Sequence, residues 1–203
     1  MTNIDTFIFD LGGVINDHDN DMLIARLLSK CDGRATDEAL IKAFCQDIYS
    51  TGENSIVEFF TMLRRDFGYK DNWQTFTNDW CCHLSMRPGM LEFLREFRKS
   101  FRILFLSNTN LLHWNRLLEL SNFELASYEA FLSFDMGLSK PSKAVFEKLL
   151  LSADVSPQRA IFIDDRQENI DQAISCGLGA FLYQGQGEFE DFLETSPLIL
   201  YNS

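Results

Sequence analysis

Three short apolar runs lie far apart in the chain, and each ends on a polar residue. They span residues 6–10 (TFIFD), 102–107 (RILFLS) and 160–165 (AIFIDD). Short runs rich in Ile, Phe and Leu that are separated by helix-length segments are typical of buried parallel strands. In such sheets, ligands bind beyond the carboxyl ends of the strands. The pattern therefore predicts an α/β fold that gathers polar strand-end residues at one edge of the sheet.

Between residues 19 and 84 the apolar positions follow helical spacing, and we find no strand-like run among them. Four helices are expected, around residues 23–31, 40–48, 56–67 and 73–84. The third is the clearest, because Ser55 and Glu58 have the spacing of a capping box just before an apolar stripe. The pattern predicts a small helical bundle inserted into the sheet.

From Pro88 onward, helical and strand-like segments alternate again, ending with a short apolar strand at residues 180–183. Strands that alternate with helices indicate right-handed βαβ crossovers. We therefore expect a Rossmann-like parallel sheet core built from residues 1–17 and 87–203. Residues 18–86 are expected to form a helical cap domain.

Charge and composition limit the classes of partner. The formal net charge of the 203 residues is −12, and Lys and Arg form no cluster, which argues against a nucleic-acid partner. No apolar stretch approaches the roughly 20 residues that a membrane span needs. The five cysteines are odd in number and follow no metal-ligand spacing, so we expect a reducing, cytoplasmic location. A small-molecule substrate remains open.

The strand-end residues carry the candidate chemistry. Burying several carboxylates together is costly, so Asp10, Asp164 and Asp165 at one edge imply a compensating divalent cation. Gly12 and Gly13 allow a sharp turn after Asp10 that brings backbone N–H groups close to a bound anion. Taken singly, each position also has a structural interpretation as a turn or a helix cap. Other candidates at strand ends and in loops are Ser107, Asn108, Lys140 and Asn169.

The order of these residues changes the interpretation. A strand-end Asp, a strand-end Ser, a loop Lys before Pro and a strand-end Asp pair follow one another along the chain. This order resembles the haloacid dehalogenase superfamily over essentially the whole chain. The segment Phe-Asp-Leu-Gly-Gly-Val-Ile at residues 9–15 is similar to the first motif of that family. The helical insert resembles the C1-type cap of its phosphatase branch, which includes α-glucose-1-phosphate phosphatases.

The resemblance implies a role for each motif residue. Asp10 would be the covalent nucleophile, and Ser107 would hydrogen-bond the transferred phosphoryl group. Lys140 would pair with both the nucleophile and the phosphate. Mg²⁺ would be held by Asp10, Asp164, Asp165 and the backbone carbonyl of Gly12. The expected activity is Mg²⁺-dependent hydrolysis of a small phosphorylated metabolite through an aspartyl phosphate.

One position departs from the family pattern. Phosphatases of this family usually carry an Asp two residues after the nucleophile, as an acid and base for the leaving group and water, and here that residue is Gly12. General acid catalysis contributes about 10² to 10⁴-fold, so a substrate with a more acidic hydroxyl, such as a sugar 1-phosphate, is the hypothesis. Asp17, His18 and Asp19 are nearby candidates to replace the missing group.

Two other functions stay open at this stage. The dehalogenases of the family also attack with an Asp and lack the second Asp, but they need no Mg²⁺ and have no Asp pair in the fourth motif. A binding protein that kept the fold and lost catalysis is the other alternative. Thr51, Gly52 and Glu53 lie between two expected cap helices and are candidates for a specificity loop. The oligomeric state is not predicted.

Overall fold

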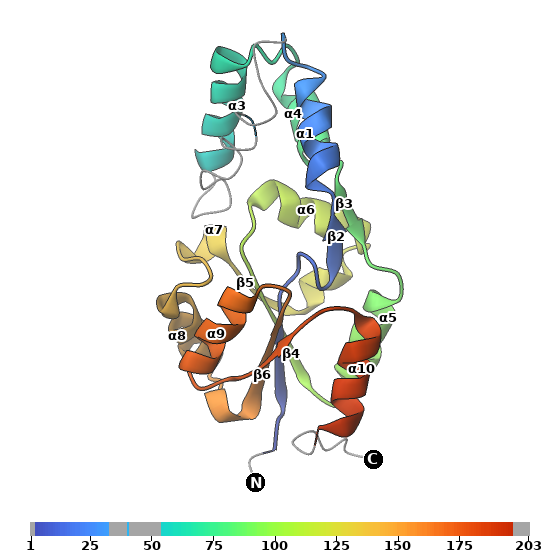
Figure 1. The fold of residues 1–203 in the computed structure, drawn as a ribbon, viewed down its shortest axis with the longest axis vertical. Coiled ribbons are helices and arrows are strands. Elements are labelled where there is room, and N and C mark those ends of the chain that lie inside the picture. Colours follow the sequence, from blue (N-terminus) through green and yellow to red (C-terminus); the bar gives the residue numbers. More distant parts are fainter. Residues whose placement is uncertain (1–2, 33–39, 41–53, 197–203) are drawn as a thin grey trace.

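A five-stranded sheet forms the centre of the molecule (Figure 1). The computed structural model describes residues 3–32, 40 and 54–196, and the side chains of residues 54 and 55 are outside this description. Spatial order in the sheet is β5-β4-β1-β6-β7, and every pairing is parallel, which confirms the predicted α/β class. The strands are β1 (Thr6–Phe9), β4 (Arg102–Ser107), β5 (Glu129–Leu132), β6 (Ala160–Asp164) and β7 (Gly179–Leu182).

The register of the sheet brings the predicted strand ends to one edge. Phe9 lies opposite Phe105 on β4 and opposite Ile163 on β6. The next residue, Asp10, continues the ladder by donating its backbone N–H to the carbonyl of Ile163 at 2.9 Å. The carboxyl ends of β1, β4 and β6 are therefore level with one another, as the parallel arrangement predicts.

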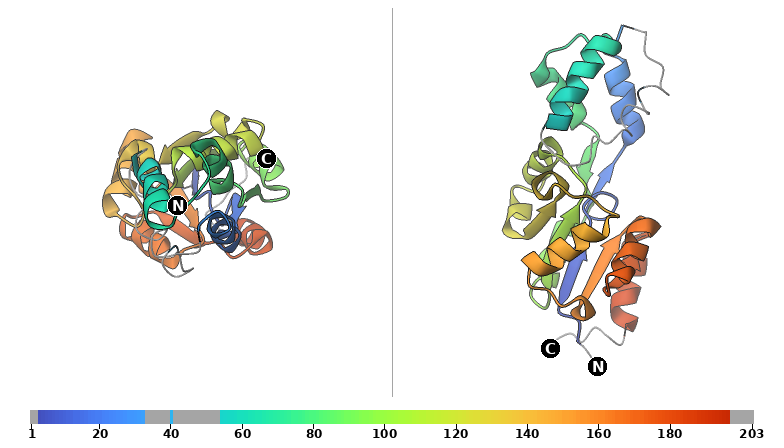
Figure 2. Two further views of the ribbon diagram at one scale, coloured as in Figure 1. Left: turned by 90° about the horizontal axis from the view of Figure 1, so that it is seen from above. Right: turned by 90° about the vertical axis from the view of Figure 1, so that its left-hand side faces the viewer.

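Helices cover both faces of the sheet (Figure 2). Because strand side chains alternate, Phe7 and Phe9 enter one apolar core and Ile8 enters the other. The first core is completed by α5 (Met90–Phe97), α6 (Leu111–Leu120) and α10 (Gln186–Thr195). The second is completed by α8 (Lys143–Ser152) and α9 (Gln167–Ser175). Short turns occur at α7 (Ser133–Met136), η1 (Glu124–Ser127) and η2 (Pro157–Arg159).

A separate helical cluster lies at the upper end of the molecule in Figure 1, away from the sheet (Figures 1 and 2). It contains α1 (Asn20–Leu28), α3 (Asn54–Asp66) and α4 (Trp73–Trp80), whose apolar faces share their own core. Three of the four helices expected here are therefore confirmed, whereas the helix expected around residues 40–48 falls almost wholly outside the described residues. The limits of the two domains stay a prediction. Within the described residues, no helix is both long and apolar enough to cross a membrane.

A two-stranded antiparallel ribbon links the helical cluster to the sheet (Figure 1). Its strands are β2 (Asn16–His18) and β3 (Leu84–Met86), with His18 opposite Leu84. The expectation of no strand near residue 84 was wrong. Each strand has only three residues and β2 is wholly polar, so neither gives an apolar alternation that indicates a strand.

Helix α8 offers a matched test of the packing. Leu149 is 1% exposed within the second core, whereas Leu151 on the same helix is 84% exposed. We expect Leu149→Ala to lower the free energy of unfolding by about 2–5 kcal/mol, because it removes buried methyl groups and leaves a cavity. Leu151→Ala should change it by less than about 0.5 kcal/mol. Urea unfolding of both variants checks this, and equal losses would contradict the assigned face of α8.

Candidate active site

Asp10 is the first residue after β1, and its carboxylate is held from two sides. The Oδ1 atom accepts the backbone N–H of Leu11 at 2.7 Å and lies 2.9 Å from Nζ of Lys140. Both interactions use the same oxygen. The second oxygen, Oδ2, takes part in no hydrogen bond or ion pair among the described residues. One oxygen of this buried carboxylate is thus anchored and the other is left to react or to bind a cation.

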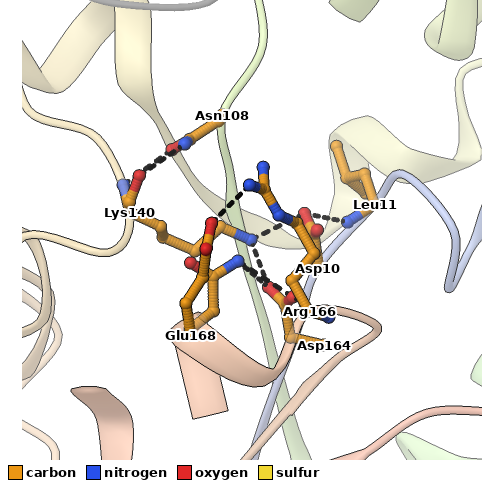
Figure 3. Close-up of polar contacts among 8 residues, drawn as sticks. Asp10, Leu11, Asn108, Lys140, Asp164, Arg166 and Glu168 are labelled. Atoms are coloured by element: carbon orange, nitrogen blue, oxygen red, sulfur yellow. Dashed lines mark hydrogen bonds and ion pairs between the residues drawn. The ribbon is translucent and has the colours of Figure 1, made fainter. Parts of the chain in front are cut away.

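The ammonium group of Lys140 joins the nucleophile candidate to β6. Nζ lies 2.6 Å from Oδ2 of Asp164, so one buried lysine pairs with two carboxylates (Figure 3). The backbone of Lys140 is fixed by Asn108, whose side chain donates to the Lys140 carbonyl and accepts its N–H, both at 2.8 Å. Asn108 was a candidate from the sequence for binding phosphate, and its side-chain hydrogen bonds position the lysine loop.

Asp164 is fully buried, and its carboxylate accepts hydrogen bonds from residues that follow it in the chain. Oδ1 accepts the backbone N–H of Arg166 at 2.9 Å. The side-chain amide of Asn169, in the first turn of α9, donates to both oxygens at 2.9 and 3.0 Å. The Oδ1 atom of Asn169 is buried without a hydrogen-bond partner. Asn169 therefore orients the carboxylate of Asp164. At the rim, Arg166 pairs with Glu168 (Figure 3).

The electrostatics of the site follow from burial. Burial raises the pKa of Asp10 to about 6, the ammonium of Lys140 works against this shift, and Asp164 adds to it. Burial also works against the charged form of Lys140, but Asp10 and Asp164 outweigh it and raise the pKa of the lysine. With Asp165 nearby, three carboxylates face one ammonium group, and the site is net negative. It has room for more positive charge.

The carboxylates meet the requirements of a small divalent cation. Asp10, Asp164 and Asp165 each offer an oxygen, and these oxygens lie within 4.8 Å of one another. Two oxygens bound to one Mg²⁺ at about 2.1 Å lie at most about 4.2 Å apart, so small side-chain shifts are sufficient. Gly13 has a φ of +75°, and a Cβ there would lie 2.1 Å from Oδ2 of Asp165. The glycine leaves the space that the Asp165 carboxylate occupies, and the residues fit the ion.

A cavity of about 260 Å³ opens above these residues. Sequence analysis identified several of its lining residues, namely Asp10, Gly12, Ser107, Asn108, Lys140, Asp165 and Asn169. It missed Thr109, which follows Asn108 and whose N–H is bound by the Ser133 hydroxyl at 3.0 Å. The unbroken run of polar residues after β4 is the sequence signal by which Thr109 could have been identified. The specificity-loop candidates Thr51, Gly52 and Glu53 lie outside the described residues.

Two candidate acid or base residues point elsewhere. On β2, alternation places Asn16 and His18 on the cavity side and Asp17 on the other. Asp17 pairs with Arg87, with Oδ1 2.6 Å from Nε. Asp19 caps α1 by accepting the N–H of Met22 at 2.9 Å. Neither carboxylate is among the residues that line the cavity.

Three histidines that share no motif spacing all line the cavity: His18, His83 and His113. The ring of His113 stacks on Trp80 with 5.2 Å between centroids, and the ring of His83 lies 5.1 Å from it. Burial, followed by the charge of His18, lowers the pKa of His83 to about 4. Burial, followed by the charge of His83, lowers the pKa of His113 to about 3. The sequence does not reveal this group, because the ribbon and α6 bring it together.

These pKa values predict acid sensitivity. In the unfolded chain a histidine has a pKa near 6.5 and binds a proton below that pH, whereas buried His113 in the folded protein stays unprotonated. The free energy of unfolding therefore falls as the pH drops from about 6.5 toward 4. His113→Gln removes one such group. We expect the pH slope of the unfolding free energy to decrease by on the order of 1 kcal/mol per pH unit. Urea unfolding between pH 4.5 and 7 measures it, and identical slopes would contradict the prediction.

The chain resembles known proteins over most of its length. A curated D-ribitol-5-phosphate phosphatase of Bacteroides thetaiotaomicron is 28% identical over 88% of this chain and 91% of its own length. A crystal structure of a HAD family enzyme from the same organism, in complex with magnesium and inorganic phosphate, has a TM-score of 0.79 at 24% identity. That alignment covers 91% of this chain and 96% of the other.

The fold is shared more widely. The structure of a predicted HAD-like family hydrolase from Porphyromonas gingivalis has a TM-score of 0.80 at 21% identity, over 95% of this chain and 99% of the other. The haloacid dehalogenase-like hydrolase family model matches residues 4–177. The match spans every motif named above, from Asp10 to Asn169. The chain therefore belongs to the haloacid dehalogenase-like hydrolases.

Proposed function

We propose that this hydrolase is a Mg²⁺-dependent phosphatase of small phosphorylated metabolites, with Asp10 as its nucleophile. The observation that carries the proposal is the buried carboxylate of Asp10 at the cavity floor, with Oδ1 anchored by Leu11 and Lys140. An anchored carboxylate with one uncommitted oxygen is positioned for attack on a substrate held above it.

Charge is the main obstacle to that attack. Two unit charges of the same sign about 4 Å apart repel by on the order of 4 kcal/mol at an effective dielectric constant of 20. Lys140 supplies a fixed positive charge 2.9 Å from Asp10, and buried Ser107 at the end of β4 faces the same cavity. When bound, Mg²⁺ would be held by Asp10, Asp164, Asp165 and the carbonyl of Gly12, and would supply the remaining screening.

The reaction would proceed in two steps. The Oδ2 atom of Asp10 forms a bond to phosphorus while the bond from phosphorus to the substrate oxygen breaks, and the departing oxygen takes up a proton, which leaves an aspartyl phosphate and an alcohol. Water then attacks the aspartyl phosphate, releases phosphate and restores the carboxylate. Lys140 stays ion-paired to Asp164 throughout and stabilises the charge that develops on the transferred group.

The similarity to a D-ribitol-5-phosphate phosphatase supports a sugar or polyol phosphate as the substrate class. Gly12 supports a narrower hypothesis. It carries no acidic side chain, so any proton for the leaving oxygen comes from another position, and a substrate whose leaving hydroxyl is relatively acidic, such as a sugar 1-phosphate, needs that proton least. A polyol phosphate and a sugar 1-phosphate release products of similar size. They differ in the acidity of the leaving hydroxyl, so a comparison of substrates must vary that acidity.

A panel of phosphate esters tests the function. We expect Mg²⁺-dependent release of phosphate that is abolished by EDTA and by Asp10→Asn, with glucose 1-phosphate hydrolysed at a higher kcat/KM than ribitol 5-phosphate or glycerol 3-phosphate. Faster turnover of glycerol 3-phosphate than of glucose 1-phosphate would refute the sugar 1-phosphate hypothesis but not the phosphatase function. Chloride release from 2-haloacids in EDTA would favour a dehalogenase. No turnover of any ester would favour a binding protein.

Gly13 provides a sharper test of the cation site. Gly13→Ala would force a Cβ into the space of the Asp165 carboxylate, in addition to the backbone strain of about 1–2 kcal/mol at a φ of +75°. Gly89 has a φ of +76° and has no atom within 4 Å of its added Cβ, so Gly89→Ala carries the same backbone strain alone. We expect only Gly13→Ala to raise the Mg²⁺ concentration needed for half-maximal activity, by at least about 10-fold. Equal Mg²⁺ dependence in both variants would contradict this.

A further inference from the structure

An alcohol leaves a phosphate ester poorly unless its oxygen gains a proton, and this inference rests on the proposed function. Several cavity-lining side chains are unsuited to supply that proton. Lys140 is committed to two ion pairs, and an arginine such as Arg166 does not release its proton in a protein. Asp165 belongs to the set of carboxylates suited to a cation. The three histidines remain.

Two of these histidines are buried by their packing. His83 and His113 are each 4% exposed. The Nε2 atom of His113 lies 3.3 Å from the carbonyl of Trp80, and its ring is stacked on that tryptophan. Burial keeps both imidazoles neutral at neutral pH. His18 differs from them in burial, because its side chain is exposed at the cavity.

The ribbon holds His18 beside the nucleophile loop. His18 pairs with Leu84, and the next residue, Asp19, donates its N–H to the carbonyl of His83 at 3.1 Å. At the other end of β2, the carbonyl of Asn16 accepts the N–H of Gly13 at 2.8 Å. The strand that carries His18 is thus bonded directly to the loop that follows Asp10.

The imidazole of His18 occupies the space next to Gly12. A Cβ built on Gly12 would lie 3.6 Å from Nδ1 and 3.7 Å from Cε1 of His18. These are ordinary van der Waals distances, so a side chain at position 12 would project toward the ring without a steric clash at its first atom. The space that an acidic side chain at position 12 would use is therefore lined by an imidazole.

We propose that His18 is the catalytic residue that protonates the leaving oxygen. The imidazolium N–H transfers its proton to the ester oxygen as the bond from phosphorus to that oxygen breaks, and the product is a neutral alcohol. The neutral imidazole then takes a proton from the water that attacks the aspartyl phosphate, which returns His18 to its starting form. No oxidant, reductant or further co-reactant is needed. This assigns to a strand residue the role for which Gly12 has no side chain.

Substrates with different leaving groups distinguish a catalytic role of His18 from a structural one. p-Nitrophenolate departs without taking up a proton, whereas the glycerol oxygen of glycerol 3-phosphate needs a proton in order to leave. We expect His18→Ala to slow phosphoryl transfer from glycerol 3-phosphate by about 10² to 10⁴-fold and the p-nitrophenolate burst by less than about 10-fold. Rapid-quench single-turnover measurements with the intact chain and Mg²⁺ give both rates. Ser85→Ala is the control, because Ser85 is exposed on the partner strand and is not among the cavity-lining residues.

A compensating variant makes the test specific. Gly12→Asp in the His18→Ala background places a carboxyl in the vacated space, and we expect it to recover at least about 10-fold of the lost rate with glycerol 3-phosphate. Equal losses on both substrates, no loss on either, or no recovery in the double variant would overturn the role of His18 while leaving the phosphatase function intact. Failure of the unaltered chain to hydrolyse p-nitrophenyl phosphate would overturn both.

Discussion

The pair of ion pairs made by Lys140 is the interaction on which the site depends. Its ammonium lies 2.9 Å from Asp10 and 2.6 Å from Asp164, and it is itself only 6% exposed. Removing one partner from a buried charge pair leaves an uncompensated charge, which typically costs about 3–5 kcal/mol. Sheet register, the Asn108 bridge and the Asn169 amide all serve to bring these three charges together. The geometry of the proposed nucleophile, Asp10, is consequently inseparable from the packing of the strands.

The same arrangement balances part of the charge in the carboxylate cluster. Lys140 offsets part of the negative charge and keeps the carboxylates of Asp10 and Asp164 close together. Asp165 lies outside this pair, and its position is set by the room that Gly13 leaves. Burial, with help from Asp164, raises the pKa of Asp165. The cluster is thus held together by one internal charge, and a bound cation is the charge proposed to complete it.

Much of this could be predicted from the sequence, because the informative residues sit at the ends of strongly apolar strands. The runs before Asp10, Ser107 and Asp164 fix both the strand type and the edge at which these residues meet. The sequence did not reveal β2 and β3, because strands of three residues are too short for a periodicity to be recognised and form through pairing with each other. Helix α10 was also missed. Asp17 and His18 looked equivalent as candidates, and only the alternation along an unrecognised strand distinguishes them.

The ribbon has a further consequence for how such a hydrolase can diversify. Its strand β2 is bonded to the loop after Asp10, whereas the helical cluster begins only beyond it, at α1. Residues on the ribbon are therefore tied by a backbone bond to the loop after Asp10, and the helices lie beyond them. In a fold divided in this way, the proposed proton donor and the helices above it belong to separate elements, so that a change of helix sequence need not alter the strand that carries the chemistry.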